Sequence, residues 1–396
     1  MKSDNEKVFY ASLGEYADVI DPHPSHRAPE EVADGYPFLG IGDIDYFGTA
    51  AFDKVRHVDV SVIEDHEKSY IIDDKTIGYA KMGNTIGKIV SFPDRSKHRY
   101  AISPALSIIN PKPNINPWYL RAVVESYEFW GHVNSKITGS TRPSIGIQQL
   151  RNVPIPIFPN EIQNIIGEIW KVIYDKISLN MKINENLLQQ AQTLYKERFV
   201  DMRPFDGVMP ADWHLGTVKE IIELHDSKRI PLSSRERANL AKIYTYYGAT
   251  SVMDYVDRYL FDGIYLLLGE DGTVVDSKGF PILQYVEGKF WVNNHAHIIT
   301  GKNGFTVETL YLLFSLTNVQ SIVTGAVQPK ISQANLNKVP VIIPSEAELL
   351  AFDSIVKPIF AQIRNLRTEN KRLATVRDTL LPRLMSGELE VSNIDL

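Results

Sequence analysis

An internal repeat limits, more than any other feature, what this chain can fold into. Residues 138–154 read TGSTRPSIGIQQLRNVP, and residues 324–340 read TGAVQPKISQANLNKVP. The two stretches align without a gap at an offset of 186 residues, and seven of their seventeen positions are identical. The repeat therefore predicts two units that share a plan but differ in sequence over most of their length.

A strand and a long helix are expected after each copy of the repeat. The segments IPIFP at 155–159 and VIIP at 341–344 suit short strands that are ended by their prolines. Apolar residues then recur at three- and four-residue steps, from about 161 to 199 and from about 345 to 384. This spacing keeps one narrow face apolar over about five heptads, which favours a coiled-coil seam.

The two long helices are expected to pack against each other. One coiled-coil helix of about 40 residues is marginal in water, whereas two in one chain can bury each other's apolar stripes. We predict antiparallel packing, with the globular parts at opposite ends of helices about 60 Å long. Pro358 is expected to kink or break the second helix. Asn184 and Asn370 lie either in the seam, where they would fix its register, or toward solvent.

The globular parts are predicted at 1–158 and 200–343, and both have mixed α and β patterns. Strands are expected within 36–45, 99–110, 241–250 and 279–292, the last with a turn near Glu287-Gly288. A helix is expected to close each part before the repeated loop. One is N-capped by Asn116 and covers WYLRAVVESYEFW, and the other covers TVETLYLLFSL.

The composition is that of a globular protein without thiol chemistry. The 396 residues are 44% hydrophobic and 23% charged. The absence of cysteine excludes disulfides, thiolate zinc sites and a cysteine nucleophile. No apolar run approaches the roughly 18 residues that a membrane span requires, and MKSDNEK has no signal-peptide core. A soluble cytoplasmic protein is expected.

The charge pattern gives mixed evidence about nucleic acids. The formal net charge of −6 counts weakly against a free-standing nucleic-acid binder. Lys/Arg residues nevertheless gather within 81–99 and within 228–237. A solvated surface is the alternative interpretation of both clusters.

KMGNTIGK, residues 81–88, resembles a phosphate-binding loop without matching one. A P-loop has four residues between its glycines and a Ser or Thr after the lysine, whereas three residues and Ile89 stand here. Either the segment is a tight turn between strands, or its glycines let the backbone approach a phosphate beside Lys81 and Lys88.

No motif predicts catalysis by this chain alone. His295 and His297 have the spacing of two metal ligands, but no third ligand is evident, and packed or hydrogen-bonded histidines are the alternative that we favour. The sequence contains no GxSxG, no DPPY- or NPPY-type methyltransferase motif and no helicase signature. We expect a non-catalytic protein with no bound metal.

Taken together, these motifs resemble the DNA-specificity subunit of type I restriction–modification systems. The resemblance covers nearly the whole chain. It rests on the paired TG-x-x-x-P-x-I loops, the V-P-[IV] strand after each loop and the two long helices. PLSSRER at 231–237 and LLPRLMSGELEV at 380–391 add to it. One departure is that the first unit has SHRAPEE at 25–31 where a PLSSRER-like segment is expected, which leaves its corresponding DNA-facing loop unassigned.

The resemblance implies an α+β fold with a pseudo-two-fold repeat. It has two mixed α/β target-recognition domains, 1–158 and 200–343, separated by two long helices packed as an antiparallel coiled coil. The helices occupy 159–199 and 344–388 as spacers, and a tail covers 389–396. Each domain would read one half of a split DNA site, and helix length would set the unread spacer.

The same resemblance implies the partners. These are double-stranded DNA, two methyltransferase subunits and two restriction subunits, with S-adenosylmethionine on the methyltransferase and no cofactor on this chain. The repeated segments would be similar because each meets one copy of the same partner. A coiled-coil interaction scaffold that never touches DNA is the alternative, motivated by the acidic charge.

The candidate DNA-binding residues lie in three kinds of loop. They come from the KMGNTIGK segment, from the basic segment of the second unit, and from matched points of the two TG loops. They are Lys81, Asn84, Thr85, Lys88, Arg142, Ser144, Lys228, Arg229, Ser233, Ser234, Arg235, Gln328 and Lys330.

Overall fold

The computed structural model describes residues 8–23, 27–139, 141–325, 327–385 and 388, so the expected tail at 389–396 lies outside the described residues. The chain forms two compact units. Unit 1 contains residues 1–180 and 369–396, and unit 2 contains residues 181–368. Among the described helices, none combines the length and the apolar character that crossing a bilayer would need.

Unit 1 is built on a small antiparallel sheet in the order β2-β8-β5-β6, beside a three-stranded sheet in the order β4-β3-β7. A separate ladder joins β1 to β9. The strands are β1 (Phe9–Ser12), β2 (Ala17–Ile20), β3 (Tyr36–Leu39), β4 (His57–Val58), β5 (Ile77–Ala80), β6 (Ile89–Val90), β7 (Ala101–Ile102), β8 (Leu106–Pro111) and β9 (Pro154–Ile157). The helices before the long one are α1 (Leu13–Tyr16), α2 (Val60–Ser69), α3 (Pro117–Val124), α4 (Tyr127–Asn134) and α5 (Ile147–Arg151).

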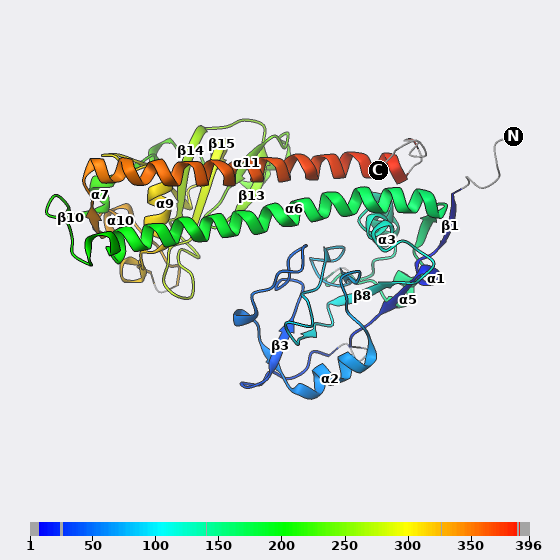
Figure 1. Ribbon diagram of the computed structural model, residues 1–396. Helices are drawn as coiled ribbons and strands as arrows, with labels where there is room; N and C mark the ends of the chain where they lie inside the picture. The colour runs from blue at the N-terminus through cyan, green and yellow to red at the C-terminus, as the bar shows by residue number, and fades with distance from the viewer. Residues whose placement is uncertain (1–7, 24–26, 140, 326, 386–387, 389–396) are drawn as a thin grey trace. The chain divides into compact units, whose positions relative to one another are not determined.

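The helix expected after Asn116 is present but divided in two. Asn116 caps α3 as predicted, because its side chain accepts hydrogen bonds from the backbone N–H groups of Trp118 and Tyr119. The helix then ends near Glu125, and Ser126 caps α4 by accepting from the N–H of Phe129. The backbone N–H of Asn116 donates to the side-chain oxygen of Gln163 on the long helix α6, and Figure 1 shows α3 against the start of α6.

Unit 2 is built on a six-stranded sheet in the order β11-β16-β14-β15-β12-β13, with a separate ladder between β10 and β17. The strands are β10 (His214–Thr217), β11 (Ile222–Leu224), β12 (Tyr244–Tyr247), β13 (Val252–Val256), β14 (Phe261–Gly269), β15 (Leu283–Val292), β16 (Ala296–Gly301) and β17 (Pro340–Ile343). The short helices are α7 (Val218–Ile221), α8 (Ser234–Ala238), α9 (Val307–Ser315) and α10 (Gln333–Leu336).

The prediction of a turn near Glu287-Gly288 is wrong. Strand β15 runs through both residues, and Gly288 pairs with Gly263 of β14. Both glycines have positive φ, 78° and 136°, so they locally distort the strands without reversing the chain. Glycine in a strand marks irregular geometry as well as turns, and the sequence alone did not separate the two.

The two long helices are α6 (Asn160–Tyr195), followed by a π-helical turn at Lys196–Val200, and α11 (Glu346–Met385). They pack antiparallel in each unit. In unit 1 the Asn180 amide donates to both Glu369 and Asn370 at 2.8 Å. Farther along, Trp170 shares a core with Leu381. The direction of packing is therefore as predicted (Figure 1).

In unit 2 the other halves of the two helices pack in the same way. The rings of Phe199 and Phe352 lie 4.9 Å apart, while Ala191 and Phe360 belong to the same core. Pro358 is exposed and does not end α11, so the expected break is absent. Asn370 faces α6, as a seam residue should. The side-chain oxygen of Asn184 is buried and lacks a hydrogen-bond partner among the described residues.

The two units repeat the same backbone plan. In unit 1, β1 pairs with β9 from Phe9 opposite Ile157 to Ser12 opposite Pro154. The ladder of β10 and β17 has the same register, from His214 opposite Ile343 to Thr217 opposite Pro340. Strand β2 pairs with β8 as β11 pairs with β16. Residues of these paired strands can therefore be matched one by one between unit 1 and unit 2.

Candidate nucleic-acid interface

Each TG loop closes on itself through its own backbone. In unit 1 the N–H and carbonyl groups of Thr138 exchange two hydrogen bonds of 2.9 Å with those of Ser144. In unit 2 Thr324 and Lys330 do the same at 2.9 and 2.7 Å. The glycines Gly139 and Gly325 have φ of 86° and 88°. A Cβ at either glycine would press on the carbonyl oxygen three residues later, so only glycine fits without strain.

Most of the other identities in the repeat are also explained by the fold. Ile145, Leu150 and Val153 are buried in unit 1, and so are their counterparts Ile331, Leu336 and Val339 in unit 2. The carbonyl of Val153 accepts from the N–H of Leu13, and that of Val339 accepts from the N–H of Val218. Loop closure and burial thus account for these shared residues without a shared partner.

A second loop docks beside each TG loop. In unit 1 the N–H of Gly83 donates to the carbonyl of Pro143 at 2.8 Å. The N–H of Ile145 donates to the carbonyl of Lys81 at 2.9 Å. We call the turn 82–85 and the loop 138–144 the paired loops of unit 1. Asn84, Thr85 and Arg142 are exposed on them, and Ser144 is half-buried. The structure thus joins two segments that the sequence presented separately.

The paired loops of unit 2 are the turn 271–273 and the loop 324–330. The N–H of Gly272 donates to the carbonyl of Pro329 at 3.0 Å, and the N–H of Ile331 donates to that of Glu270 at 2.9 Å. Gln328 and Lys330 are exposed there. The Lys330 ammonium lies 3.2 Å from the Glu270 carboxylate.

Lys81 is not available for binding DNA in this structure. Its side chain is 3% exposed, and its ammonium lies 2.5 Å from the Asp21 carboxylate. Burial lowers the pKa of Lys81, and the contact with Asp21 opposes that shift. We therefore leave Lys81 out of the interface. Lys88 is exposed and donates to the backbone carbonyl of Ile41 at 3.0 Å.

Arg229 has a structural role as well. Its guanidinium donates to Glu270 at 2.6 Å and to the backbone carbonyl of Ala296 at 2.8 Å, and the side chain is 14% exposed. We leave it out of the interface for the same reason as Lys81. The neighbouring Lys228 is exposed. The chain Arg229–Glu270–Lys330 also brings this basic segment beside the second TG loop.

The PLSSRER segment forms the N-terminus of helix α8. Ser233 caps the helix, because its hydroxyl accepts from the N–H of Glu236 and donates to the Glu236 carboxylate. Ser234 and Arg235 are exposed, whereas Arg237 is buried and pairs with Asp254 of β13 at 3.0 Å. The segment therefore presents Arg235 from a helix that is anchored to the edge strand β13.

Asp226, Glu270 and His297 form a compact group of possible metal ligands. The Asp226 carboxylate already accepts from the His297 ring at 2.6 Å, from the Ile298 N–H at 2.9 Å and from Gln333. Burial raises the pKa of Asp226, but these hydrogen bonds outweigh it and hold the pKa below its ordinary value. Arg229 lies within 3.5 Å of Asp226 and repels a cation, so the group is an ion-pair network.

The two histidines do not converge on one site. His297 bonds Asp226 on one side and the carbonyl of Ile331 on the other at 2.8 Å. His295 instead lies 2.5 Å from Asp271. Packed and hydrogen-bonded histidines are what the structure contains. His297 also ties β16 to the residue that follows the second TG loop.

A family comparison decides what these two matched units belong to. The model of the type I restriction modification DNA specificity domain matches residues 24–189 and again residues 210–376. The chain belongs to this family. One similar relative is the type I restriction enzyme MjaIX specificity subunit of Methanocaldococcus jannaschii, 24% identical over 72% of each chain. Another is the type I restriction enzyme HindI specificity subunit of Haemophilus influenzae, 22% identical over 89% of this chain and 94% of that one.

Among solved structures, a similar chain is the type I restriction–modification system S subunit from M. genitalium. It is 15% identical, covers 97% of each chain and has a TM-score of 0.49. The two family matches fall one on each side of residue 200, in agreement with the duplicated plan. DNA sequence recognition follows from membership of the specificity family.

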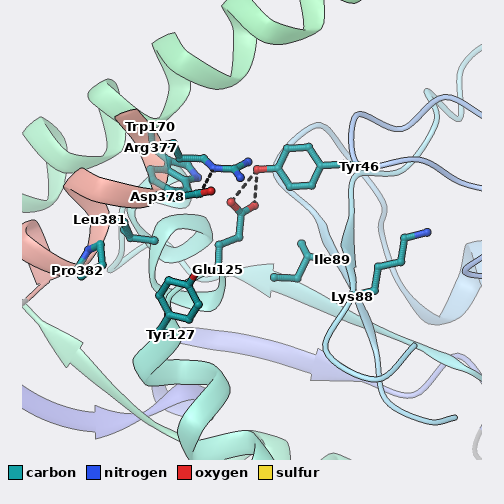
Figure 2. Close-up of a pocket in the computed structure, with 10 residues that line it drawn as sticks. All are labelled: Tyr46, Lys88, Ile89, Glu125, Tyr127, Trp170, Arg377, Asp378, Leu381 and Pro382. Atoms are coloured by element: carbon teal, nitrogen blue, oxygen red, sulfur yellow. Dashed lines mark hydrogen bonds and ion pairs between the residues drawn. The ribbon is translucent and has the colours of Figure 1, made fainter. Parts of the chain in front are cut away.

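Unit 1 of this specificity-domain chain also contains a pocket of about 520 Å³. Figure 2 shows the Tyr46 hydroxyl aimed at the Glu125 carboxylate, to which it donates at 2.7 Å, and Arg377 joined to Asp378 at 2.8 Å. Arg121 pairs with Glu125 at 2.8 Å, and burial raises the pKa of Tyr46. Both carboxylates of the described lining thus have side-chain partners.

No motif in the sequence predicts a role for strand β13 of the specificity-domain chain. It is the edge of the six-stranded sheet, and Val252, Met253 and Tyr255 are exposed along it. Exposed apolar residues on an edge strand beside a basic helix are a feature of binding surfaces. The β-prone run SVMDYV was a usable signal for a strand, but nothing in it marks an edge.

Proposed function

We propose that this chain is a non-catalytic specificity subunit that reads a bipartite DNA target. The parts at 1–158 and 200–343 act as target-recognition domains, one for each half-site. The observation that carries the proposal is the pair of TG loops. Their backbones are closed by the same hydrogen bonds, yet their exposed side chains differ. Equal scaffolds with unequal side chains suit two domains that perform one task on two different sequences.

The proposed interface is the candidate set without Lys81 and Arg229. It comprises Asn84, Thr85, Lys88, Arg142 and Ser144 in unit 1, and Lys228, Ser233, Ser234, Arg235, Gln328 and Lys330 in unit 2. These residues are exposed or half-buried and lie on loops or at a helix start. The cations would neutralise phosphates, and the amides and hydroxyls would contact base edges.

The partners we propose are two methyltransferase subunits and two restriction subunits. S-adenosylmethionine would bind to the methyltransferase. A net charge of −6 leaves this chain poorly suited to hold DNA alone, so the partners would supply much of the phosphate contact. A chain that selects a DNA site and recruits enzymes to it needs no catalytic group of its own.

Methylome sequencing tests the proposal. Cells that carry the chain with its methyltransferase should methylate one split motif, and a strain without the chain should lose methylation at that motif. A methylome with no split motif that depends on the chain would refute the proposal. The scaffold alternative, in which the chain never touches DNA, predicts no salt-dependent DNA affinity for the chain alone or in complex, whereas phosphate contacts produce a steep salt dependence.

We also propose that the helical segments 159–199 and 344–388 set the length of the unread spacer. Residues could be added to α6 after Asn180 and, in equal number, to α11 before Glu369. Each added turn lengthens a helix by about 5.4 Å, or one to two base pairs at about 3.4 Å each. The spacer of the methylated motif should lengthen while both half-sites stay the same. Changed half-sites would contradict this division of labour.

A further inference from the structure

We propose that the tip of each TG loop reads one base, Arg142 a guanine in one half-site and Gln328 an adenine in the other. The inference rests on the proposed function and deepens it, because it assigns a base to a named side chain in each unit. Arg142 and Gln328 occupy the same place, three residues after the glycine that closes each loop.

The backbone alone fixes where these two side chains begin. Each loop is closed by two hydrogen bonds between its first and last residues, and its proline carbonyl accepts from a glycine N–H of the neighbouring turn. The closing glycines differ by only 2° in φ. Side chains on a scaffold held in this way are positioned well enough for a directional contact with a base.

Neither side chain is required to hold its loop together. Arg142 is exposed, has no carboxylate partner among the described residues and makes only a weak contact of 3.6 Å with the sulfur of Met82. Gln328 is exposed, and no side-chain hydrogen bond to it occurs in the described structure. A long polar side chain without an internal role, at the same point of two loops, is available for an external partner.

The hydrogen-bonding groups of Arg142 and Gln328 differ in the way that those of guanine and adenine differ. A guanidinium can donate two hydrogen bonds to O6 and N7 of guanine in the major groove. A carboxamide can accept from N6 and donate to N7 of adenine. Arginine at position 142 and glutamine at position 328 therefore match two different base pairs from one loop geometry.

The residue before each tip supports insertion into a groove over contact with the phosphates. Val327 is 99% exposed, more than any other large hydrophobic side chain of the described residues. Its counterpart, Thr141, is also exposed and carries a methyl group. An isolated valine gains little near a phosphate, whereas the methyl group of thymine offers an apolar contact in the major groove.

The acids beside the second loop do not oppose this approach. Glu270 is paired with Arg229 at 2.6 Å and with Lys330 at 3.2 Å. Asp271 is hydrogen-bonded to the His295 ring at 2.5 Å. Arg229 and Lys330 offset the negative charge of Glu270, which would otherwise repel the duplex from Gln328.

The test exchanges the two tips in the full chain, co-expressed with its methyltransferase partner. Arg142→Gln should change one position of one half-site from guanine to adenine, and Gln328→Arg should make the reverse change in the other half-site. Methylation of the original motif should fall about 5- to 150-fold in each variant, the range expected for one bidentate contact. The untouched half-site should stay the same in each variant.

Gln148→Ala is the matched control, because Gln148 is exposed on α5 outside the tip. Thermal unfolding of each purified complex checks that the variants are folded. Three results would overturn the inference: an unchanged motif, a uniform loss of methylation at every sequence, or a change in the wrong half-site. If the unaltered chain directs no split motif, the proposed function itself has failed, and that result is distinguishable from these three.

Discussion

The two units hold their TG loops with the same backbone contacts but with different charges beneath them. In unit 1 a single pair, Asp21 with Lys81, lies under the loop. At the place of Lys81, unit 2 has Glu270, and positive charge comes instead from Arg229 beside Asp226, while the His297 ring hydrogen-bonds the same carboxylate. The backbone geometry is therefore kept while the ion pairs that support it are replaced, which means that the hydrogen-bonded frame defines the loop.

The largest loss of stability is expected when the Asp226 network of unit 2 is broken. Asp226→Ala should remove the acceptor of the His297 ring and of the Ile298 N–H in a buried site, together with one of the two acidic partners of Arg229. The expected cost is about 3–5 kcal/mol of unfolding free energy. Lys81→Met in unit 1 should cost about 1–3 kcal/mol, because Asp21 is 11% exposed and also accepts from the N–H of His23. Denaturant unfolding of the two variants measures the difference. Equal costs would contradict the contrast between the networks.

A second difference concerns how acid changes the stability of the fold. In unit 1 His66 is buried beside His23, with ring centres 4.6 Å apart, and burial lowers the pKa of His66 to about 4. In the unfolded chain the histidine would titrate near pH 6.5, so the unfolded state binds more protons as pH falls from about 6.5 to 4. Stability should therefore fall across this range, by about 2 kcal/mol after allowance for partial solvation.

Thermal unfolding from pH 7 to pH 4 measures this effect. His66→Gln should remove most of the pH dependence assigned to this residue. His225→Gln in unit 2, at a histidine whose pKa burial also lowers, provides the comparison. If both variants keep the full acid sensitivity of the parent chain, the loss of stability arises elsewhere.

The smallest effect is expected from a test of whether the two TG loops are equivalent. Gly139→Ala and Gly325→Ala each place a Cβ in the left-handed region and against a carbonyl oxygen, which costs about 1–3 kcal/mol locally. Each should weaken methylation about 5- to 150-fold, the change that this energy produces. Gly207→Ala, also at positive φ but with open space around the added Cβ, controls for backbone strain alone. Loss of activity in one TG variant only would show that the loops are not equivalent.

The features predictable from the sequence are those that it encodes locally. Heptad spacing predicted both long helices and their pairing, and Asn116 followed by Pro117 predicted the start of α3. The repeat itself predicted two units of one plan. The division of the helix at Ser126 was missed, because a serine within an apolar helical pattern does not distinguish a new cap from a tolerated residue.

The site was less predictable, because its contacts join distant segments. Lys81 and Asp21 are sixty residues apart, and a basic loop in sequence does not show that one of its lysines is buried. The docking of the KMGNTIGK turn on the TG loop likewise depends on backbone hydrogen bonds that no motif encodes. The two copies of the loop distinguish positions that are shared and buried from positions that vary and are exposed.

The closing glycines have a consequence for how such a chain can change over generations. Each loop is closed by main-chain atoms, so its outermost side chains make almost no contacts that the fold requires. Substitutions there can accumulate without unfolding either half. A lineage could therefore alter the sequence that it marks in small steps while its architecture is inherited intact.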